Sequence, residues 1–187
     1  MTRLIFLGPP GSGKGTQAAV ISSSYSFPHI STGDILRQAV SQGTELGQKA
    51  QTYMDRGDLV PDDLILGIVR DRLSEPDAKT GWLLDGFPRN VEQATYLESL
   101  LDGIGQTCDR VLNLQVSDDS IVKRLLERGR KDDNEEVIRH RLQVYRQQTA
   151  PLIDFYQSRQ KLVSVNGDRS VEEVTHSLKT VVNSLAH

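Results

Sequence analysis

Short apolar runs alternate along the chain with longer segments in which apolar residues recur at helical spacing. The short runs predict buried strands, because they are bounded by turn-forming residues. They cover residues 3–7, 27–31, 81–86, 109–116 and 161–167. The longer segments predict helices. These cover residues 14–23, 32–40, 44–57, 61–74, 90–101, 117–129, 134–156 and 170–185, and we expect the helix over 134–156 to kink near Pro151.

This alternation predicts an α/β fold, with a central five-stranded parallel sheet between two layers of helices. Residues 31–60 hold helices without a strand, so we expect them to form an excursion over the sheet. In such sheets ligands bind at the carboxyl ends of the strands. The glycine-rich segment after Leu7, the carboxylate of Asp85 and the turn after "KLVSV" all follow predicted strands. The sequence therefore predicts a single site at this edge.

Composition narrows the class of protein. The chain has 187 residues and a net charge of -3, which fits one domain and argues against a general nucleic-acid binder. Cys108 is the single cysteine, so neither an intrachain disulfide nor a cysteine-cage zinc site is expected. The run "LIFL" is too short for a signal peptide, and no stretch has the length of a membrane span. We expect a cytoplasmic protein.

The segment "GPPGSGKGT" after the first strand nearly matches the phosphate-binding pattern G-x-x-x-x-G-K-[ST]. Gly8 and Gly13 keep the spacing, and Lys14 follows. Backbone N–H groups of such a loop surround an anion, and the next helix points its positive end at the same place. Gly15 stands where the pattern has Ser or Thr, and the hydroxyl comes one residue later, at Thr16. This shift argues against direct ligation of magnesium by a hydroxyl of the loop. The alternative is an ordinary glycine-rich turn with a surface lysine.

Arginines follow strand ends and helix starts. "STGDILR" places Arg37 near the start of a helix, and "LLDGFPR" places Arg89 just beyond a strand. The segments "IVKRLLERGRKDD" and "IRHRL" add Arg124, Arg128, Arg130, Arg139 and Arg141. Phosphoryl transfer depends on positioning and charge neutralisation, and the guanidinium group binds phosphate oxygens bidentately. The alternative for any single arginine is a solvated helix residue.

Four segments taken together resemble the adenylate kinase family: "GPPGSGKGTQ", "STGDILR", "LLDGFPR" followed by Gln93, and "GRKDDNEEVIRHRL". They occur in the family's order and span essentially the whole chain. The resemblance implies a P-loop fold, magnesium-dependent transfer of the terminal phosphoryl group of ATP to AMP, and two ADP as products. It also implies a single kinase domain over 1–187, with a nucleoside monophosphate-binding insertion at 31–60 and a short lid at 127–137.

The resemblance also implies roles for individual residues. The ATP-binding residues are Gly11, Ser12, Gly13, Lys14, Gly15, Thr16, Arg124, Arg128 and Arg169. The AMP-binding residues are Thr32, Arg37, Asp58, Leu59, Val60, Gly86, Phe87, Pro88, Arg89, Gln93, Arg130 and Arg141. The catalytic residues are Lys14, Arg37, Arg89, Arg128, Arg130 and Arg141. Asp85 is expected to hold Mg²⁺ through water.

The lid departs from the family's long-lid members, because Gly129 alone separates Arg128 from Arg130. We therefore expect a brief loop with no structural zinc. So short a lid covers less of the closed site than a domain would, and we expect the arginines to close over the phosphates and exclude water. Similar kinases specific for pyrimidines carry Ala and Asn where this chain has Thr32 and Gln93. This pair favours AMP as the acceptor, and UMP/CMP kinase is the near alternative.

An alternative of another class is a nucleotide-gated switch that transfers no phosphate. Guanine switches usually carry an N-K-x-D base reader, which this sequence lacks. We expect a monomer that binds ATP and AMP, with no nucleic-acid or membrane partner. Weaker signals favour structural roles. His29 lies beside a strand end and is a candidate for the site, but packing or a surface position is favoured. Cys108 is expected to be an inert thiol. Asp132 or Asp133 is expected to cap the next helix, with salt bridges from these acids to the lid arginines, and Ser117 is a candidate cap for the helix over 117–129. Pro88 is a candidate for a cis peptide bond.

Overall fold

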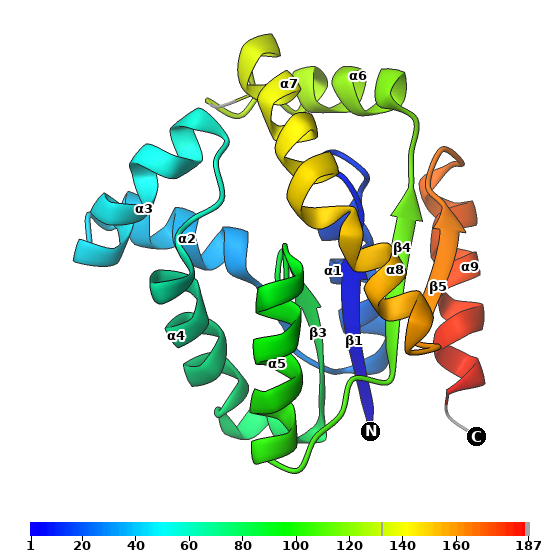
Figure 1. The fold of residues 1–187 in the computed structure, drawn as a ribbon. Coiled ribbons are helices and arrows are strands. Elements are labelled where there is room, and N and C mark those ends of the chain that lie inside the picture. Colours follow the sequence, from blue (N-terminus) through cyan, green and yellow to red (C-terminus); the bar gives the residue numbers. More distant parts are fainter. Residues whose placement is uncertain (132, 186–187) are drawn as a thin grey trace.

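The computed structural model describes residues 1–131 and 133–185 (Figure 1). Within these ranges the strands form one parallel sheet in the order β2-β3-β1-β4-β5. The strands are β1 (Thr2–Leu7), β2 (His29–Ser31), β3 (Gly81–Asp85), β4 (Arg110–Gln115) and β5 (Leu162–Asn166). The predicted parallel α/β sheet is confirmed, with strand bounds within a few residues of those expected from the apolar runs.

Helices fill the intervals between the strands, as the periodic segments predict. They are α1 (Lys14–Tyr25), α2 (Thr32–Ser41), α3 (Glu45–Arg56), α4 (Asp62–Leu73), α5 (Val91–Gly103), α6 (Asp118–Arg128), α7 (Glu135–Val144), α8 (Pro151–Ser158) and α9 (Val171–Ser184). A short 3₁₀ helix, Pro76–Thr80, precedes β3 and was not predicted. Among the described residues no helix is both long and apolar enough to cross a membrane.

The predicted kink near Pro151 is a π-helical turn over Tyr145–Thr149 that joins α7 to α8. The N–H of Ala150 donates to the carbonyl of Tyr145 at 2.8 Å, one residue further back than in an α-helix. Pro151 has no N–H to donate and occupies the first turn of α8. The interruption therefore falls where proline forbids a regular helical hydrogen bond.

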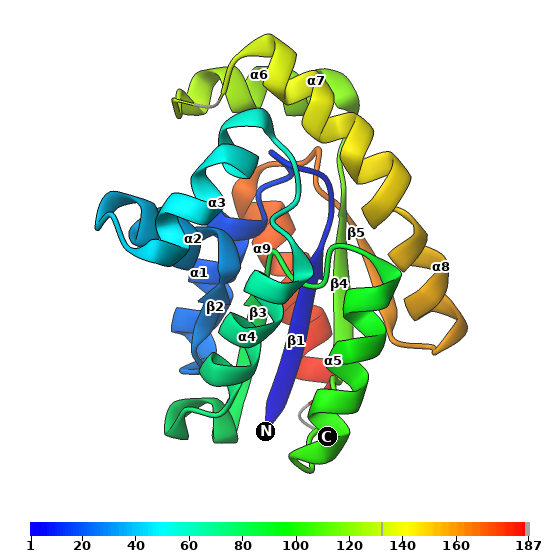
Figure 2. The same cartoon turned by 60° about the vertical axis from the view of Figure 1, so that its left-hand side comes forward.

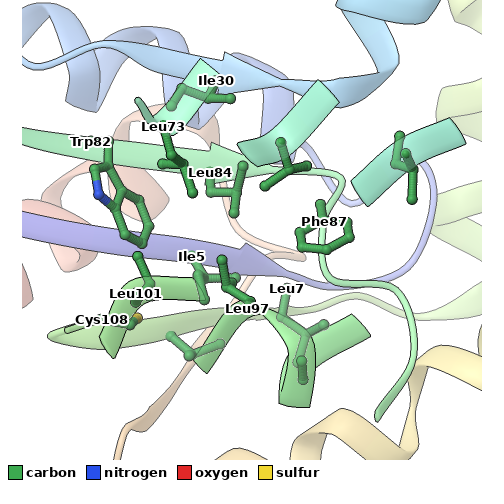
Figure 3. Packing of buried hydrophobic residues seen from close by; sticks show 14 of the residues in the cluster. Ile5, Leu7, Ile30, Leu73, Trp82, Leu84, Phe87, Leu97, Leu101 and Cys108 are labelled. Carbon is green, nitrogen blue, oxygen red and sulfur yellow. The ribbon is translucent and has the colours of Figure 1, made fainter. Parts of the chain in front are cut away.

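Two apolar clusters cover the two faces of the sheet, because successive strand residues point to opposite sides. Ile5 and Leu7 of β1 belong to the cluster formed with α4, α5 and α8, shown in Figure 3. Leu4 and Phe6 belong to the other cluster, formed with α1 and α9. Figure 2 shows α5 and α9 on opposite sides of the sheet. Cys108 is buried, and burial raises the pKa of its thiol to about 12, which agrees with the expected inert role.

The helix caps correct two local expectations. Asn134 caps α7, since its side chain accepts a hydrogen bond from the N–H of Val137. Asp133 does not cap this helix, and Asp132, the other candidate, lies outside the described residues. Ser117 holds the N-cap position of α6, but its side chain makes no capping hydrogen bond.

Glycine 47 allows α2 and α3 to cross in direct backbone contact. A Cβ atom at Gly47 would overlap the carbonyl group of Ala39, which is backbone and can yield only if the helix pair shifts. We expect Gly47→Ala to lower the free energy of unfolding by about 3 kcal/mol, as overpacking does. Gly67→Ala in α4 is the matched control, because nothing lies within 4 Å of its Cβ position. Alanine should stabilise that helix by about 1 kcal/mol. Urea unfolding measures both, and equal effects would refute the packing argument.

Candidate active site

A cleft of about 900 Å³ opens at the carboxyl edge of the sheet. β1 leads into the glycine-rich loop, β2 into Thr32, β3 ends at Asp85, and β5 leads into Gly167. Figure 1 shows α2 and α3 to one side of this edge, with α6 and α7 across it. The sheet thus brings together segments far apart in the sequence, as strand ends of a parallel sheet do.

All but one of the predicted site residues line this cleft. Those predicted to bind ATP are Gly11, Ser12, Gly13, Lys14, Gly15, Thr16, Arg124, Arg128 and Arg169. The others are Thr32, Arg37, Asp58, Leu59, Val60, Asp85, Gly86, Pro88, Arg89, Gln93, Arg130 and Arg141. Phe87 is the exception: its side chain packs in the apolar core, 1% exposed, with Leu97 and Leu84 (Figure 3). The peptide bond between Phe87 and Pro88 is cis, as Pro88 suggested.

The loop after β1 adopts backbone conformations that require glycine. Gly11 and Gly13 have φ values of +76° and +94°, which side chains disfavour. A Cβ atom at Gly11 would also lie 2.8 Å from Cγ of Leu125 in α6. Gly13 immediately precedes α1, so the loop ends at the positive end of the helix. This is the backbone arrangement that binds phosphate oxygens.

Lys14 folds back over this loop. Its Nζ donates to the carbonyl oxygens of Gly8 at 2.8 Å and Pro9 at 2.9 Å. Burial lowers the pKa of Lys14 to about 8; Asp85 opposes the shift, and Arg89 adds to it. The ammonium group therefore donates to neutral carbonyl oxygens beside the N-terminus of α1, where a bound anion would be stabilised.

Asp85 is the buried carboxylate of the site, 8% exposed at the end of β3. His29 Nε2 lies 3.4 Å from its Oδ2. Burial alone would raise the pKa of Asp85, but the contact with His29 and the charges of Lys14 and Arg89 hold it below the usual value. Asp85 is thus an anion facing the phosphate loop. No group of three or more His, Cys, Asp or Glu side chains arranged to hold a metal ion occurs within residues 1–131 and 133–185.

The position of His29 differs from the prediction, which favoured a packing or surface role for this side chain. The residue is half-buried, lines the cleft and contacts Asp85. Its signal was its place in β2, just before the strand ends at Ser31. The parallel register sets Ser31 opposite Asp85, and the sequence does not display that pairing.

Arg89 and Arg37 lie on the side of the cleft formed by β3 and α2. Arg89 Nε donates to the carbonyl of Gly86 at 2.8 Å, and burial lowers the pKa of its guanidinium. Its own carbonyl accepts a hydrogen bond from Thr149 Oγ1 at 2.6 Å. Arg37 pairs with Asp34 one turn earlier on α2. These contacts fix Arg89 from two elements and leave Arg37 in a local, partly exposed pair.

Asp133 binds the arginines of the connection between α6 and α7. Its side chain is fully buried and accepts two hydrogen bonds from Arg128, at 2.6 and 2.8 Å. It also accepts from Arg141 Nη1 at 3.1 Å and from the N–H of Arg130 at 3.0 Å. Burial would raise the pKa of Asp133, but these partners hold it below its usual value. The expectation that acids after Arg130 hold lid arginines is confirmed for Asp133.

Arg37, Arg89, Arg128, Arg130 and Arg141 all line the cleft, and their charges influence one another. Burial, together with the nearby charges of Arg128, Arg89, Arg130 and Arg37, lowers the pKa of Arg141 to about 10. A guanidinium whose pKa falls for this reason gains from any anion placed among the group. The cluster is therefore built to receive a multiply charged anion.

Two contacts outside the predicted set complete the walls. His140 Nε2 of α7 lies 2.6 Å from Oδ1 of Asp58, joining α7 to the segment after α3. On the opposite wall, Arg124 Nη2 donates to the carbonyl of Gly167 at 2.8 Å, which links α6 to the turn after β5. Neither contact was expected, because each joins segments more than forty residues apart.

Comparison with known proteins identifies the family. A family model described as adenylate kinase matches residues 6–161. "Adenylate kinase 1" of Nostoc sp. (strain PCC 7120) is 62% identical over 98% of this chain and 100% of its own length. "Adenylate kinase 1" of Synechocystis sp. (strain PCC 6803) is 58% identical over 96% of both chains. "Adenylate kinase" of Trichodesmium erythraeum is 53% identical over 99% of this chain and all of its own. The chain belongs to the adenylate kinase family.

Proposed function

We propose that the cleft performs the adenylate kinase reaction, ATP + AMP to two ADP, with the residues assigned to it above. The phosphates of ATP lie in the loop Gly11–Thr16, and AMP lies between α2 and the turn 86–89. The observation that supports this most strongly is that one cleft is lined both by the glycine-rich loop and by five of the predicted catalytic or AMP-binding arginines. They are Arg37, Arg89, Arg128, Arg130 and Arg141. Such an arrangement fits two anionic ligands placed phosphate to phosphate.

The transfer is an in-line displacement at the terminal phosphorus of ATP. An oxygen of the AMP phosphate forms the new bond, and the bond to the β-phosphate bridging oxygen breaks, leaving ADP on both sides. The loop amides and Lys14 hold the outer phosphates, while the arginines offset charge on the transferred group. AMP needs no general base, because its phosphate is already ionised near neutral pH. No covalent intermediate with the protein forms.

Asp85 is suited to assist a magnesium ion. Mg²⁺ usually keeps several waters and binds one or two carboxylates together with substrate phosphates. Asp85 provides one ionised carboxylate beside Lys14 and the loop, so the residues fit a water-mediated contact. When bound with ATP, Mg²⁺ neutralises charge on its outer phosphates.

The pair Thr32 and Gln93 supports AMP rather than UMP or CMP as the acceptor. Both side chains are almost fully buried against the cleft, at 1% and 3% exposed. Thr32 Oγ1 donates to the carbonyl of Asp85 at 3.4 Å, so this side chain closes the wall at the base of α2. The amide of Gln93 offers one donor and one acceptor to the edge of a base.

The short lid is proposed to exclude water through the arginines themselves. α6 ends at Arg128, Gly129 takes a left-handed conformation, and α7 begins at Glu135, so a brief connection replaces a domain. Asp133 ties this connection to Arg128 and Arg141. A closed and dry site prevents water from accepting the phosphoryl group in place of AMP.

The assay that tests this proposal follows ADP formed from ATP by the purified protein with Mg²⁺. We expect rapid ADP formation with AMP, at least tenfold less with UMP or CMP, and hydrolysis below about 1% of transfer when AMP is omitted. Hydrolysis comparable to transfer would contradict closure by the short lid. Preference for UMP or CMP would support the pyrimidine kinase, and nucleotide binding without any ADP would support the switch.

The remaining assignments are a monomer in the cytoplasm, without nucleic-acid or membrane partners. They are supported by the net charge of -3 and the single, buried cysteine. Sedimentation at micromolar concentration tests the oligomeric state, and a mass of two chains would contradict it.

A further inference from the structure

The side-chain amide of Gln93 is held at both ends. Gln93 lies in the first turn of α5 and is 3% exposed. Its Oε1 accepts a hydrogen bond from the N–H of Arg89 at 2.7 Å. Its Nε2 donates to Oδ1 of Asp62, the first residue of α4, at 2.7 Å. Asp62 was not among the predicted site residues; it does not line the cleft within the described part of the chain, but it is hydrogen-bonded to Gln93, which does.

These two partners allow one orientation of the amide. A carboxylate only accepts hydrogen bonds, and a backbone N–H only donates them. Rotating the amide of Gln93 by half a turn would set Oε1 against the carboxylate of Asp62 and Nε2 against the N–H of Arg89. Both contacts would become repulsive, and buried polar groups would lose their partners. The positions of the oxygen and nitrogen therefore follow from the network.

The orientation decides which purine edge the amide can read. After its two internal bonds, Gln93 keeps one Oε1 lone pair and one Nε2 hydrogen. Adenine offers an amino donor beside a ring-nitrogen acceptor, which complements this fixed pair. A 6-oxopurine offers the reverse on its Watson–Crick edge, an oxygen acceptor beside an N–H donor. That reversed pair complements only the rotated amide.

We propose that Asp62 is a positioning residue that makes the acceptor site select AMP over 6-oxopurine monophosphates such as IMP and GMP. The inference rests on the proposed role of Gln93 at the base of AMP. Asp62 acts by holding the amide of Gln93 in the orientation that complements adenine. Its neighbour Asp63 shares the same helix turn and charge but is exposed. Hydrogen bonding to Gln93 therefore distinguishes Asp62 from a residue that merely favours the start of a helix.

The test compares Asp62→Asn with Asp63→Asn. The amide that Asp62→Asn introduces can itself turn and donate to Oε1 of a rotated Gln93, so one of the two restraints disappears. We expect the ratio of kcat/KM for AMP to that for IMP to fall about tenfold in Asp62→Asn, which is the discrimination one charged hydrogen bond supplies. The ratio should stay within twofold of wild type in Asp63→Asn. Because it is measured within one preparation, partial misfolding does not change it.

Two further variants separate the possible failures. Asp62→Ser, whose hydroxyl both donates and accepts, should lower the ratio as well and serves if Asp62→Asn does not fold. Gln93→Ala should raise the KM for AMP at least tenfold with a smaller change in the KM for ATP. An unchanged KM for AMP would overturn the proposed site itself. A raised KM together with an unchanged AMP-to-IMP ratio in both Asp62 variants would overturn the role of Asp62 alone.

Discussion

Lys14→Met is expected to lose about a thousandfold or more in kcat with AMP and ATP and to keep its fold. The ammonium group lies against the loop, and among the described residues it donates to the carbonyls of Gly8 and Pro9 and to the hydroxyl of Ser12. A phosphate that replaces them gains a charge-assisted bond that strengthens as charge moves during transfer. A thousandfold corresponds to about 4 kcal/mol of transition-state stabilisation. Steady-state ADP formation measures the loss, and circular dichroism checks the fold.

The control is Lys123→Met, an exposed lysine of α6, which should change kcat less than twofold. Retention of more than a tenth of the wild-type kcat by Lys14→Met would contradict the central role of this side chain. A parallel loss in Lys123→Met would point to general charge rather than to the loop.

The pH dependence of the free energy of unfolding gives an independent check on the burial of the Lys14 ammonium group. Its pKa in the folded protein is about 8, below the ordinary 10.5. Below pH 8 Lys14 is protonated in both the folded and the unfolded chain, so burying its charge destabilises the folded protein to the full extent. Between pH 8 and 10.5 the unfolded chain binds more protons, so the free energy of unfolding from this group rises with pH. The Lys14→Met variant should lack this rise when urea unfolding is compared at pH 7 and 9.5.

Much of the fold could be predicted because its signals are local. The apolar runs at 3–7 and 81–86 were sufficient for strands, and Pro151 marked the break between α7 and α8. The glycine-rich loop was evident because its chemistry is contained in consecutive residues. The 3₁₀ turn at Pro76–Thr80 was missed, since its short polar sequence has no periodicity to detect.

Site residues could be predicted where they belong to one sequence motif, but not where the fold brings distant segments together. Arg89 and Gly86 followed from the segment after β3, but Phe87 in the same segment turns into the core. Asp62 and Gln93 are 31 residues apart, and His140 and Asp58 are 82 apart. Pairings across such intervals depend on how helices cross, which hydrophobic patterning does not specify.

Asp133→Asn should lower the free energy of unfolding by about 3 kcal/mol, the loss expected when one partner of a buried ion pair is removed. Asparagine keeps the shape but not the charge, so Arg128, Arg130 and Arg141 face one another without this carboxylate. ATP and AMP supply replacement charge, and a bisubstrate dinucleotide should therefore raise the melting temperature more in the variant than in wild type. Differential scanning calorimetry with and without the dinucleotide measures both effects.

The matched control is Glu136→Gln, which removes an exposed acid from the first turn of α7 and should cost less than about 0.5 kcal/mol. The stabilities of wild type and Asp133→Asn can also be compared at acidic pH. Because the pKa of Asp133 lies below its ordinary value of 3.8, its contribution is present above that pH and is lost as pH falls through the folded pKa. The stability difference between wild type and Asp133→Asn should therefore narrow on acidification. Equal losses in Asp133→Asn and Glu136→Gln would mean that the arginines need no fixed counter-charge, and that the lid connection is held by packing instead.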